Sequence, residues 1–199
     1  LPEQAAYIDN IRAEGRRMKL LVEDMLTLSR AQRSAGSLPE QTADLSEAAV
    51  TAALRFEPVA FEAGKRLEYD IAPELPVRGD GGKLGQALAA LLDNAVKYST
   101  GGTDIRLTAE KQGRFAVVTV ADSGPDIPAD KLPHIFDRFY RADEARTDGD
   151  SFGLGLPIAK AIIDAHRGTL RCESGSGVTR FIITLPLAAG KQERGTDHA

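Results

Sequence analysis

The sequence has 199 residues, a formal net charge of −4 and one cysteine. This length suits one sizeable domain plus an appendage, with a core large enough to need no covalent staples. The charge argues against a general nucleic-acid binder, because no basic excess is available to neutralise phosphates. Cys172 cannot form an internal disulfide, so a reducing compartment such as a cytoplasm is expected.

The chain contains no candidate membrane anchor. No apolar stretch approaches the roughly 20 residues that span a bilayer, and the first residues show no signal-peptide pattern. Leu1 is not an initiator methionine, so we expect that further chain precedes it. Contact with a membrane is therefore expected only through segments missing from this sequence.

Residues 2–32 have the apolar spacing of one long helix. Steps of three and four residues connect Ile8, Ile11, Gly15, Met18, Val22 and Met25. A long helix with such a stripe is not stable alone in water, so it must pack on the rest of the chain or on another helix, as in a bundle or coiled coil. Residues 34–40, which include Gly36 and Pro39, predict a break after it.

The remaining sequence alternates between helical and strand patterns. A helix is expected to begin near Ser46, whose hydroxyl is the expected N-cap, and to end around Gly64. Two further helices are expected at 83–99 and 154–165, and strands at 67–71, 105–109, 115–120, 169–172 and 180–185. This order predicts an α+β fold, an α/β sandwich whose mixed β-sheet has helices on one face, preceded by one long helix.

Asn94 is a polar residue on the strongly apolar helix LGQALAALLDNAVKYS. Taken alone, it is more simply read as a core asparagine that hydrogen-bonds nearby backbone. The functional reading is an amide oxygen that points into a pocket and binds Mg²⁺. Lys97 and Tyr98 follow within one turn, where they would supply a cation for phosphate and a ring beside a base.

Two turns that contain glycine supply the next candidate site residues. Asp122 directly follows an expected strand, where it either ends that strand in a simple turn or accepts a hydrogen bond from the amine of adenine. Gly124 would then let the backbone approach the base closely. Gly153 and Gly155 precede a helix, and a helix N-terminus offers N–H groups and a positive dipole end to an anion.

Between these turns lies a segment that mixes aromatic and basic residues, IFDRFYRAD. It reads either as a surface loop with a hydrophobic anchor or as a lid. In the lid reading, Phe136 and Phe139 anchor the segment, while Arg138 and Arg141 reach phosphates. The residues from Arg141 to Asp150 are expected to be mobile without nucleotide.

Four segments, in this order, resemble the N, G1, F and G2 boxes of bacterial two-component sensor histidine kinases. They are LLDNAVKYS, DSGPDIP, LPHIFDRFYRAD and FGLGLPIAKAIIDAHRG. The similarity spans about residues 43–186 and extends to the wider superfamily of gyrase B, the Hsp90 chaperones and MutL. The stretch LLVEDMLTLSRAQ is similar to the second helix of the dimerisation and phosphotransfer domain of these kinases.

The resemblance implies a domain organisation. Residues 1–33 would form part of the dimerisation helix, 34–43 a linker, 44–187 the ATP-binding catalytic domain and 188–199 a disordered tail. It also implies ATP and Mg²⁺ as ligands, with Asn94 as the magnesium ligand. The ATP-binding positions that it implies are Asn94, Lys97, Tyr98, Asp122, Gly124, Ile127, Leu132, Arg138, Arg141, Gly153, Leu154, Gly155 and Leu156.

Three positions depart from the family pattern. Ala90 replaces the first asparagine of the N box, and Ser151 replaces the first glycine of the G2 box. Asp126 stands where the DxGxG turn has its second glycine, and its side chain would clash with the nucleotide or repel its phosphates. None of the three histidines, His134, His166 and His198, lies in the context of a phosphoacceptor.

The leading hypothesis is therefore the ATP-binding half of a cytoplasmic histidine kinase region. It would transfer the γ-phosphate of ATP to a histidine on a helix absent from this chain, for relay to an aspartate of a response regulator. Self-association through the N-terminal helix is expected in the full-length protein. Two alternatives are a nucleotide-free regulatory module disabled by Ala90 and Asp126, and one half of a split kinase.

Overall fold

The computed structural model describes residues 2–33, 41–141 and 152–188. It begins with α1 (Pro2–Arg33), β1 (Thr42–Asp44), α2 (Leu45–Glu62), β2 (Arg66–Ile71), β3 (Pro76–Arg78) and α3 (Gly81–Tyr98). It continues with β4 (Asp104–Gln112), β5 (Phe115–Ser123), the short 3-10 helix η2 (Leu132–His134), α4 (Gly155–Ala165), β6 (Thr169–Gly175) and β7 (Val178–Pro186). The predicted α+β class and the long first helix are confirmed.

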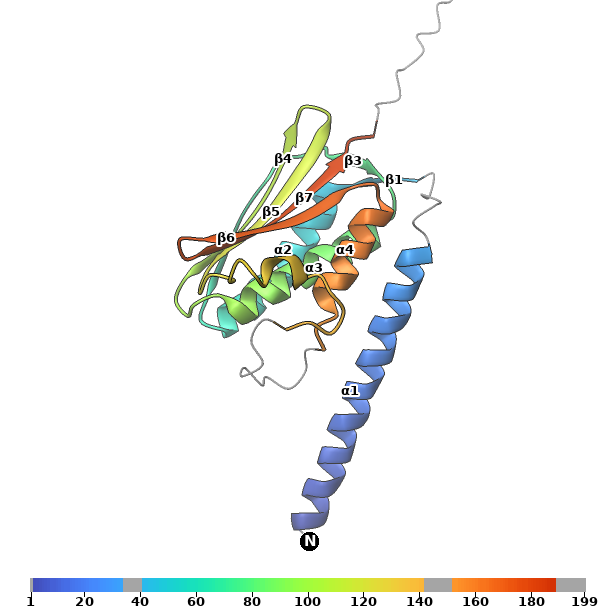
Figure 1. Ribbon diagram of the computed structural model, residues 1–199, viewed down its shortest axis with the longest axis vertical. Coiled ribbons are helices and arrows are strands. Elements are labelled where there is room, and N and C mark those ends of the chain that lie inside the picture. The colour runs from blue at the N-terminus through green and yellow to red at the C-terminus, as the bar shows by residue number, and fades with distance from the viewer. Residues whose placement is uncertain (1, 34–40, 142–151, 189–199) are drawn as a thin grey trace, which may run out of the picture.

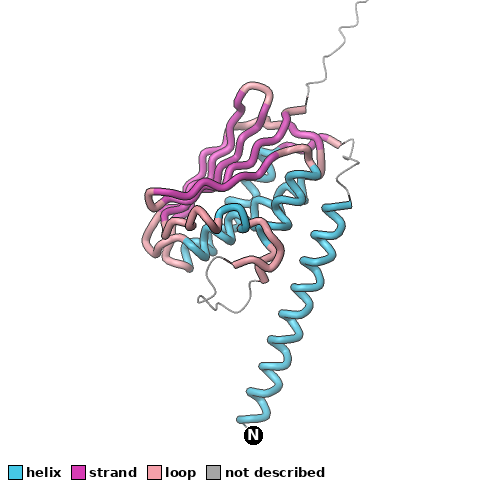
Figure 2. The backbone as a smooth tube through the Cα atoms, viewed as in Figure 1, coloured by secondary structure: helices cyan, strands magenta, loops and turns pink. Residues whose placement is uncertain are grey.

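Five strands form one mixed sheet in the order β2-β4-β5-β7-β6. The β2–β4 pair is parallel, and the other neighbours are antiparallel. Helices α2, α3 and α4 cover one face of this sheet (Figure 1), so the molecule has one helical layer and one strand layer (Figure 2). The prediction of a mixed sheet covered on one face is confirmed.

The core lies between these layers, and the sequence pattern explains why. On α3, Leu84, Leu88, Leu91 and Leu92 recur on one face and are buried. Along β5, buried residues alternate with half-exposed ones, because successive side chains of a strand point to opposite faces. The helices therefore cover the apolar face of the sheet and leave its other face exposed.

The predicted cap of α2 was wrong by two residues. The N-cap is Asp44, whose carboxylate accepts a hydrogen bond from the Ser46 amide at 2.9 Å. Ser46 lies inside the helix, where its hydroxyl donates to Ala72 O and accepts from Leu75 N. The carboxylate takes the capping role because the serine hydroxyl already holds the segment after β2.

The sequence patterns also missed a second, two-stranded sheet formed by β1 and β3. Each strand has three residues, which is too short to show alternation. Pro76 is the first residue of β3. Val77 pairs with Leu187, and the Ala188 amide donates to Pro76 O, so this small sheet fastens the end of β7.

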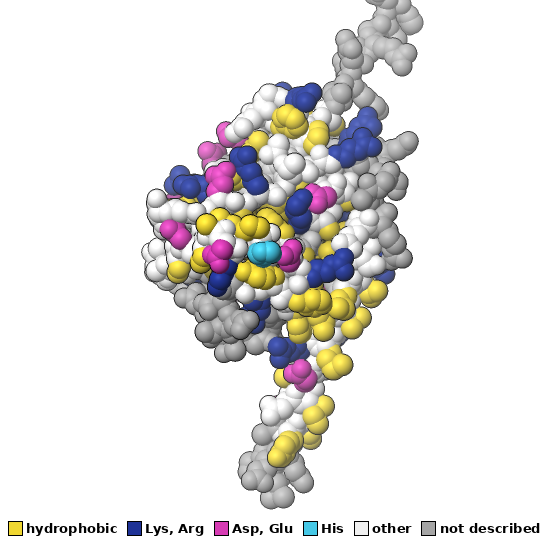
Figure 3. Space-filling view, viewed as in Figure 1, with side chains coloured by type: hydrophobic (Ala, Val, Ile, Leu, Met, Phe, Trp, Pro, Cys, Tyr) yellow, Lys and Arg dark blue, Asp and Glu magenta, His cyan; other side chains and the backbone are white. Residues whose placement is uncertain are grey.

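Helix α1 packs on α4 of the sandwich (Figure 1). Leu28 and Ala31 are buried there, and Leu21 is half-buried. The predicted stripe is a neighbouring one that stays exposed: Met18 is 62% and Val22 is 54% exposed. Apolar side chains line the part of α1 that projects away from the sandwich (Figure 3). The stripe is thus not buried against this chain.

No helix in the described part of the chain has both the length and the hydropathy needed to cross a bilayer. The predicted break at 34–40 and residues 189–199 of the expected tail lie outside the described residues.

Candidate functional site

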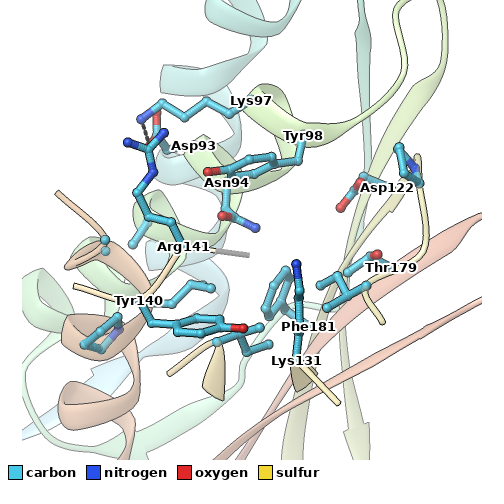
Figure 4. A pocket seen from close by; sticks show the side chains of 18 of the residues that line it. Asp93, Asn94, Lys97, Tyr98, Asp122, Lys131, Tyr140, Arg141, Thr179 and Phe181 are labelled. Atoms are coloured by element: carbon cyan, nitrogen blue, oxygen red, sulfur yellow. Dashed lines mark hydrogen bonds and ion pairs between the residues drawn. The ribbon is translucent and has the colours of Figure 1, made fainter. Parts of the chain in front are cut away.

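A cavity of about 380 Å³ lies between α3, the start of α4 and the chain that follows β5 (Figure 4). Its lining also includes Asp122 on β5 and Thr179 and Phe181 on β7. This volume is typical of a site for a small molecule. The cavity brings together residues from all four motif segments that the sequence singled out.

Asp122 supplies a buried carboxylate to this cavity. Its side chain points inward from β5 (Figure 4) and is only 5% exposed. Burial raises the pKa of this carboxyl from 3.8 to about 6, and the positive charge of Lys65 opposes the shift. An ionised carboxylate that is buried in this way is a strong hydrogen-bond acceptor for an amine donor such as the exocyclic amine of adenine.

The raised pKa of Asp122 makes the stability of the chain depend on pH. The folded state binds its proton more tightly than the unfolded state between pH 3.8 and about 6, so the free energy of unfolding falls as pH rises through this window. We expect urea unfolding without nucleotide to show wild type losing up to about 3 kcal/mol relative to Asp122→Asn across that range. A difference that does not change with pH would show that Asp122 titrates normally.

The turn after Asp122 needs glycine for close packing. A Cβ atom at Gly124 would lie 2.9 Å from Tyr98 O, so only glycine lets the end of β5 press against the end of α3. Gly124 itself is not part of the cavity lining, and neither is Leu132, which lies in η2 and packs against the core. From this segment the lining includes Ile127, Lys131 and Ile135.

Helix α3 places Asn94, Lys97 and Tyr98 on the cavity. The amide of Asn94 points into the cavity (Figure 4). Lys97 Nζ lies 2.5 Å from a carboxylate oxygen of Asp93, one turn earlier. Both side chains are more than a third exposed, so this ion pair contributes little stability and leaves the lysine able to turn toward a ligand.

The start of α4 forms another wall. Gly153 has φ +67°, and a Cβ there would lie 2.8 Å from Tyr140 O, so this turn requires glycine. Gly155 and Leu156 line the cavity, whereas Leu154 is buried in the core. Among the described residues no side chain caps this helix, so the first turn of α4 can offer backbone N–H groups to an anion.

The two candidate arginines lie in different places. Arg141 lines the cavity, close to Lys97 and Asp93 (Figure 4). Arg138 points to α1 instead, where its Nη2 donates to Gln32 Oε1 at 2.6 Å. The segment 142–151, with Ser151 and most of the expected lid, lies outside the described residues, so its mobility remains a prediction.

Two of the three positions that depart from the family pattern, Ala90 and Asp126, lie in the described part of the chain and are accommodated in the fold. Ala90 lines the cavity, and a Cβ at Gly155 would lie 3.9 Å from Ala90 Cβ, so the alanine faces the start of α4. The Asp126 carboxylate accepts a hydrogen bond from the Gly177 amide at 2.8 Å. The Asp126 side chain, which was expected to obstruct the nucleotide, thus has a hydrogen-bond partner within the protein.

The described histidines have structural partners. His134 Nδ1 lies 2.9 Å from the Asp137 carboxylate on the surface. His166 is buried, and its two ring nitrogens contact Ile162 O and the Asp80 amide. His198 lies outside the described residues. His134 and His166 thus each have a partner within the described chain.

Several lining residues were missed by sequence reasoning. Asp93 and Tyr140 lie inside motif segments, so their positions beside Asn94 and Arg141 were available signals. No local sequence signal marked Thr179 and Phe181, because they reach the cavity only through the pairing of β7 with β5. That pairing sets Thr179 opposite Asp122 and Phe181 opposite Val120.

Comparisons with known proteins agree with this geometry. The family model "Histidine kinase-, DNA gyrase B-, and HSP90-like ATPase" matches residues 79–189. Sensor protein DltS of Streptococcus agalactiae serotype III (strain NEM316) is 32% identical over 181 residues, which are 91% of this chain and 46% of DltS. Sensor histidine kinase TrcS of Mycobacterium tuberculosis is 36% identical over 195 residues, covering 94% of this chain and 38% of TrcS.

A solved structure has the same fold. Full-length ShkA in complex with AMPPNP matches with a TM-score of 0.79 and 28% identity, over 94% of this chain and 39% of that chain. This chain therefore spans less than half the length of DltS, TrcS and ShkA.

The sandwich and its cavity at the helix–sheet boundary define the class of ATPase-like catalytic domains found in histidine kinases. The chain belongs to the histidine kinase-, DNA gyrase B- and HSP90-like ATPase family, and it carries the catalytic domain of a two-component sensor histidine kinase.

Proposed function

We propose that this chain binds ATP in the cavity as the catalytic region of a histidine protein kinase. The observation that carries the proposal is the pairing of two complementary ends in one cavity. Asp122 presents a buried carboxylate on one side, and the start of α4, which no described side chain caps, lies on the other (Figure 4). Adenine offers an amine donor and the phosphates need N–H donors, so the nucleotide matches both. The ShkA structure, which contains AMPPNP, supports this reading.

The other lining residues have roles that fit this orientation. Tyr98 and Ile127 line the same cavity as Asp122 and would flank the base. Lys97 and Arg141 gather on the far side (Figure 4), where they would neutralise phosphate charge. Gly153, Gly155 and Leu156 would offer backbone to the phosphates. Gly124, Leu132 and Leu154 would shape the walls from behind, and Arg138 would join the phosphates only by leaving Gln32.

The residues present fit a magnesium ion that arrives with the nucleotide. Among residues 2–33, 41–141 and 152–188, no three His, Cys, Asp or Glu side chains gather to form a metal site of their own. Mg²⁺ commonly takes one or two protein oxygens and receives the rest from phosphates and water. Asn94 would supply one such oxygen from α3. Held there, Mg²⁺ would supply positive charge to neutralise the phosphates.

Titration with ATP tests the proposal, and Asn94→Ala tests the metal site. We expect saturable binding of ATP that Mg²⁺ strengthens, and we expect Asn94→Ala to lower the Mg²⁺-dependent part of the affinity by about tenfold or more. Calorimetry with and without Mg²⁺ measures both. GTP serves as the control nucleotide, because its base presents a carbonyl where adenine has the amine. Absence of saturable binding at millimolar ATP would favour a nucleotide-free module.

The wider activity involves parts that this chain does not contain. The chain would transfer the γ-phosphate to a histidine on a helix absent here, and a response-regulator aspartate would then accept it. The exposed stripe of α1 supports self-association, since Ile8, Met18, Val22 and Met25 have no partner within the described chain. We place the region in the cytoplasm. Mixing this chain with a helical hairpin that carries the phosphoacceptor histidine would test phosphoryl transfer. The same experiment would test the split-kinase alternative, in which that histidine belongs to another chain.

A further inference from the structure

The loop that follows β5 is fastened to the β6–β7 turn by three hydrogen bonds. The Gly124 amide donates to Gly177 O at 3.0 Å, and the Gly177 amide donates back to Asp126 Oδ1 at 2.8 Å. The Ile127 amide donates to Ser174 Oγ at 2.8 Å. Two segments about fifty residues apart in the sequence, 124–127 and 174–177, thus act as one structural unit (Figure 1).

The geometry of the β6–β7 turn explains why an acceptor is needed there. Ser176 and Gly177 both have positive φ, at 57° and 76°, and the flanking Gly175 and Val178 pair with each other. This is a two-residue hairpin turn of the kind that matches the twist of the strands. The ladder does not use the Gly177 amide, so the Asp126 carboxylate satisfies a donor that would otherwise rely on water.

The fastened loop forms part of the cavity wall. Asp126 and Ile127 line the cavity from the loop side, and Thr179 lines it from β7. Ser174 Oγ connects the two, because it accepts from Ile127 and lies 2.9 Å from Thr179 Oγ1. Thr179 is paired opposite Asp122 across the sheet. The hydrogen bonds therefore set the position of the loop relative to the carboxylate.

We propose that Asp126 is a positioning residue that preorganises the base side of the cavity. This rests on the proposed function. A glycine at this place, as in the family pattern, has no side chain to reach Gly177. The backbone at Asp126 does not demand glycine either, because the positive-φ residues other than glycine in the described chain are Glu74, Phe139, Arg167 and Ser176. The departure from the motif thus adds a contact instead of disabling the pocket.

Three variants separate positioning from charge repulsion. Asp126→Ala removes the acceptor, and we expect it to weaken binding of Mg²⁺–ATP by about threefold to tenfold. Asp126→Gly also frees the backbone and should weaken binding at least as much. Asp126→Asn keeps an acceptor oxygen without the charge and should bind as wild type does. If Asp126 instead repelled the phosphates, all three variants would bind ATP more tightly than wild type.

The Gly177 amide gives a second readout that needs no nucleotide. In ¹⁵N-resolved NMR spectra we expect Asp126→Ala to shift the amides of Gly177 and Gly124 and to speed their exchange with solvent, while Asp126→Asn restores them. Asp130→Ala is the matched control, since Asp130 is an exposed carboxylate nearby that does not line the cavity. An unshifted Gly177 amide, or unchanged affinity in Asp126→Ala beside a wild type that binds ATP, overturns this inference alone. If none of the proteins binds ATP, the proposed function falls and this inference falls with it.

Discussion

Replacing Asp122 with alanine is expected to weaken ATP binding by about 30-fold to 1000-fold, the largest functional effect of any single change in this chain. The carboxylate is 5% exposed and points into the cavity, so a bound adenine would lose a charged and largely desolvated acceptor. The adenine amine would then be buried without a partner, which adds its own desolvation cost. Calorimetric titration with Mg²⁺–ATP at pH 8 measures the change.

Stability provides the control for this loss. Burial raises the pKa of Asp122 to about 6, so the ionised carboxylate is a cost to the folded state at pH 8. The thermal midpoint of Asp122→Ala without nucleotide should therefore be no lower than that of wild type. Asp70→Ala removes an exposed carboxylate outside the cavity and should leave ATP affinity unchanged. Near-normal affinity in Asp122→Ala would mean that the base is recognised elsewhere.

The part of the candidate site that local sequence motifs encode could be predicted from the sequence. Helical periodicity sets Asn94 one turn from Lys97 and Tyr98 on the same helix, and the resemblance to the kinase boxes assigns all three to an ATP site. Asp122 follows from its place at the end of a strand, and Gly153 from its place before a helix. Each of these motifs joins residues that are close in the chain. The structure places Asn94, Asp122 and Gly153 on one cavity.

Features that depend on pairing between distant segments could not be predicted in the same way. Thr179 lines the cavity only because β7 pairs with β5 in one particular register. The side chain of Asp126 was expected to face the nucleotide, and its actual partner, Gly177, lies in a hairpin whose position no local pattern specifies. The strands β1 and β3 were missed because three residues are too few to show alternation, and their pairing also joins distant segments.

Helix α1 shows a different limit of what apolar spacing can predict. Periodicity found an apolar stripe, but α1 has two apolar faces that are close to each other. The face with Leu28 and Ala31 packs on α4, and the face with Met18 and Val22 stays exposed. A pattern of spacing tells which residues share a face, and only the tertiary structure tells which face the chain itself covers. The exposed stripe remains available for a second helix.

Replacing Gly79 with alanine is expected to destabilise the fold by about 3 kcal/mol or more, which for a chain of this size lowers the thermal midpoint by roughly 6–12 °C. Gly79 has φ +141°, and a Cβ there would lie 2.0 Å from His166 Cδ2. His166 is buried at the end of α4, where Nδ1 donates to Ile162 O at 2.7 Å and Nε2 accepts from the Asp80 amide at 3.0 Å. The extra methyl would displace the ring and break both hydrogen bonds.

The contact with His166 joins two helices that build the cavity, because Asp80 caps α3 and His166 ends α4. Gly85→Ala is the matched control: Gly85 lies inside α3 with no atom within 4 Å of an added Cβ, so alanine there should stabilise the helix by about 0.5–1 kcal/mol. The double variant Gly79→Ala/His166→Ala isolates the clash. Removing the ring should cost much less in the Gly79→Ala background than in wild type, and additive costs in urea unfolding would show that the two residues do not depend on each other.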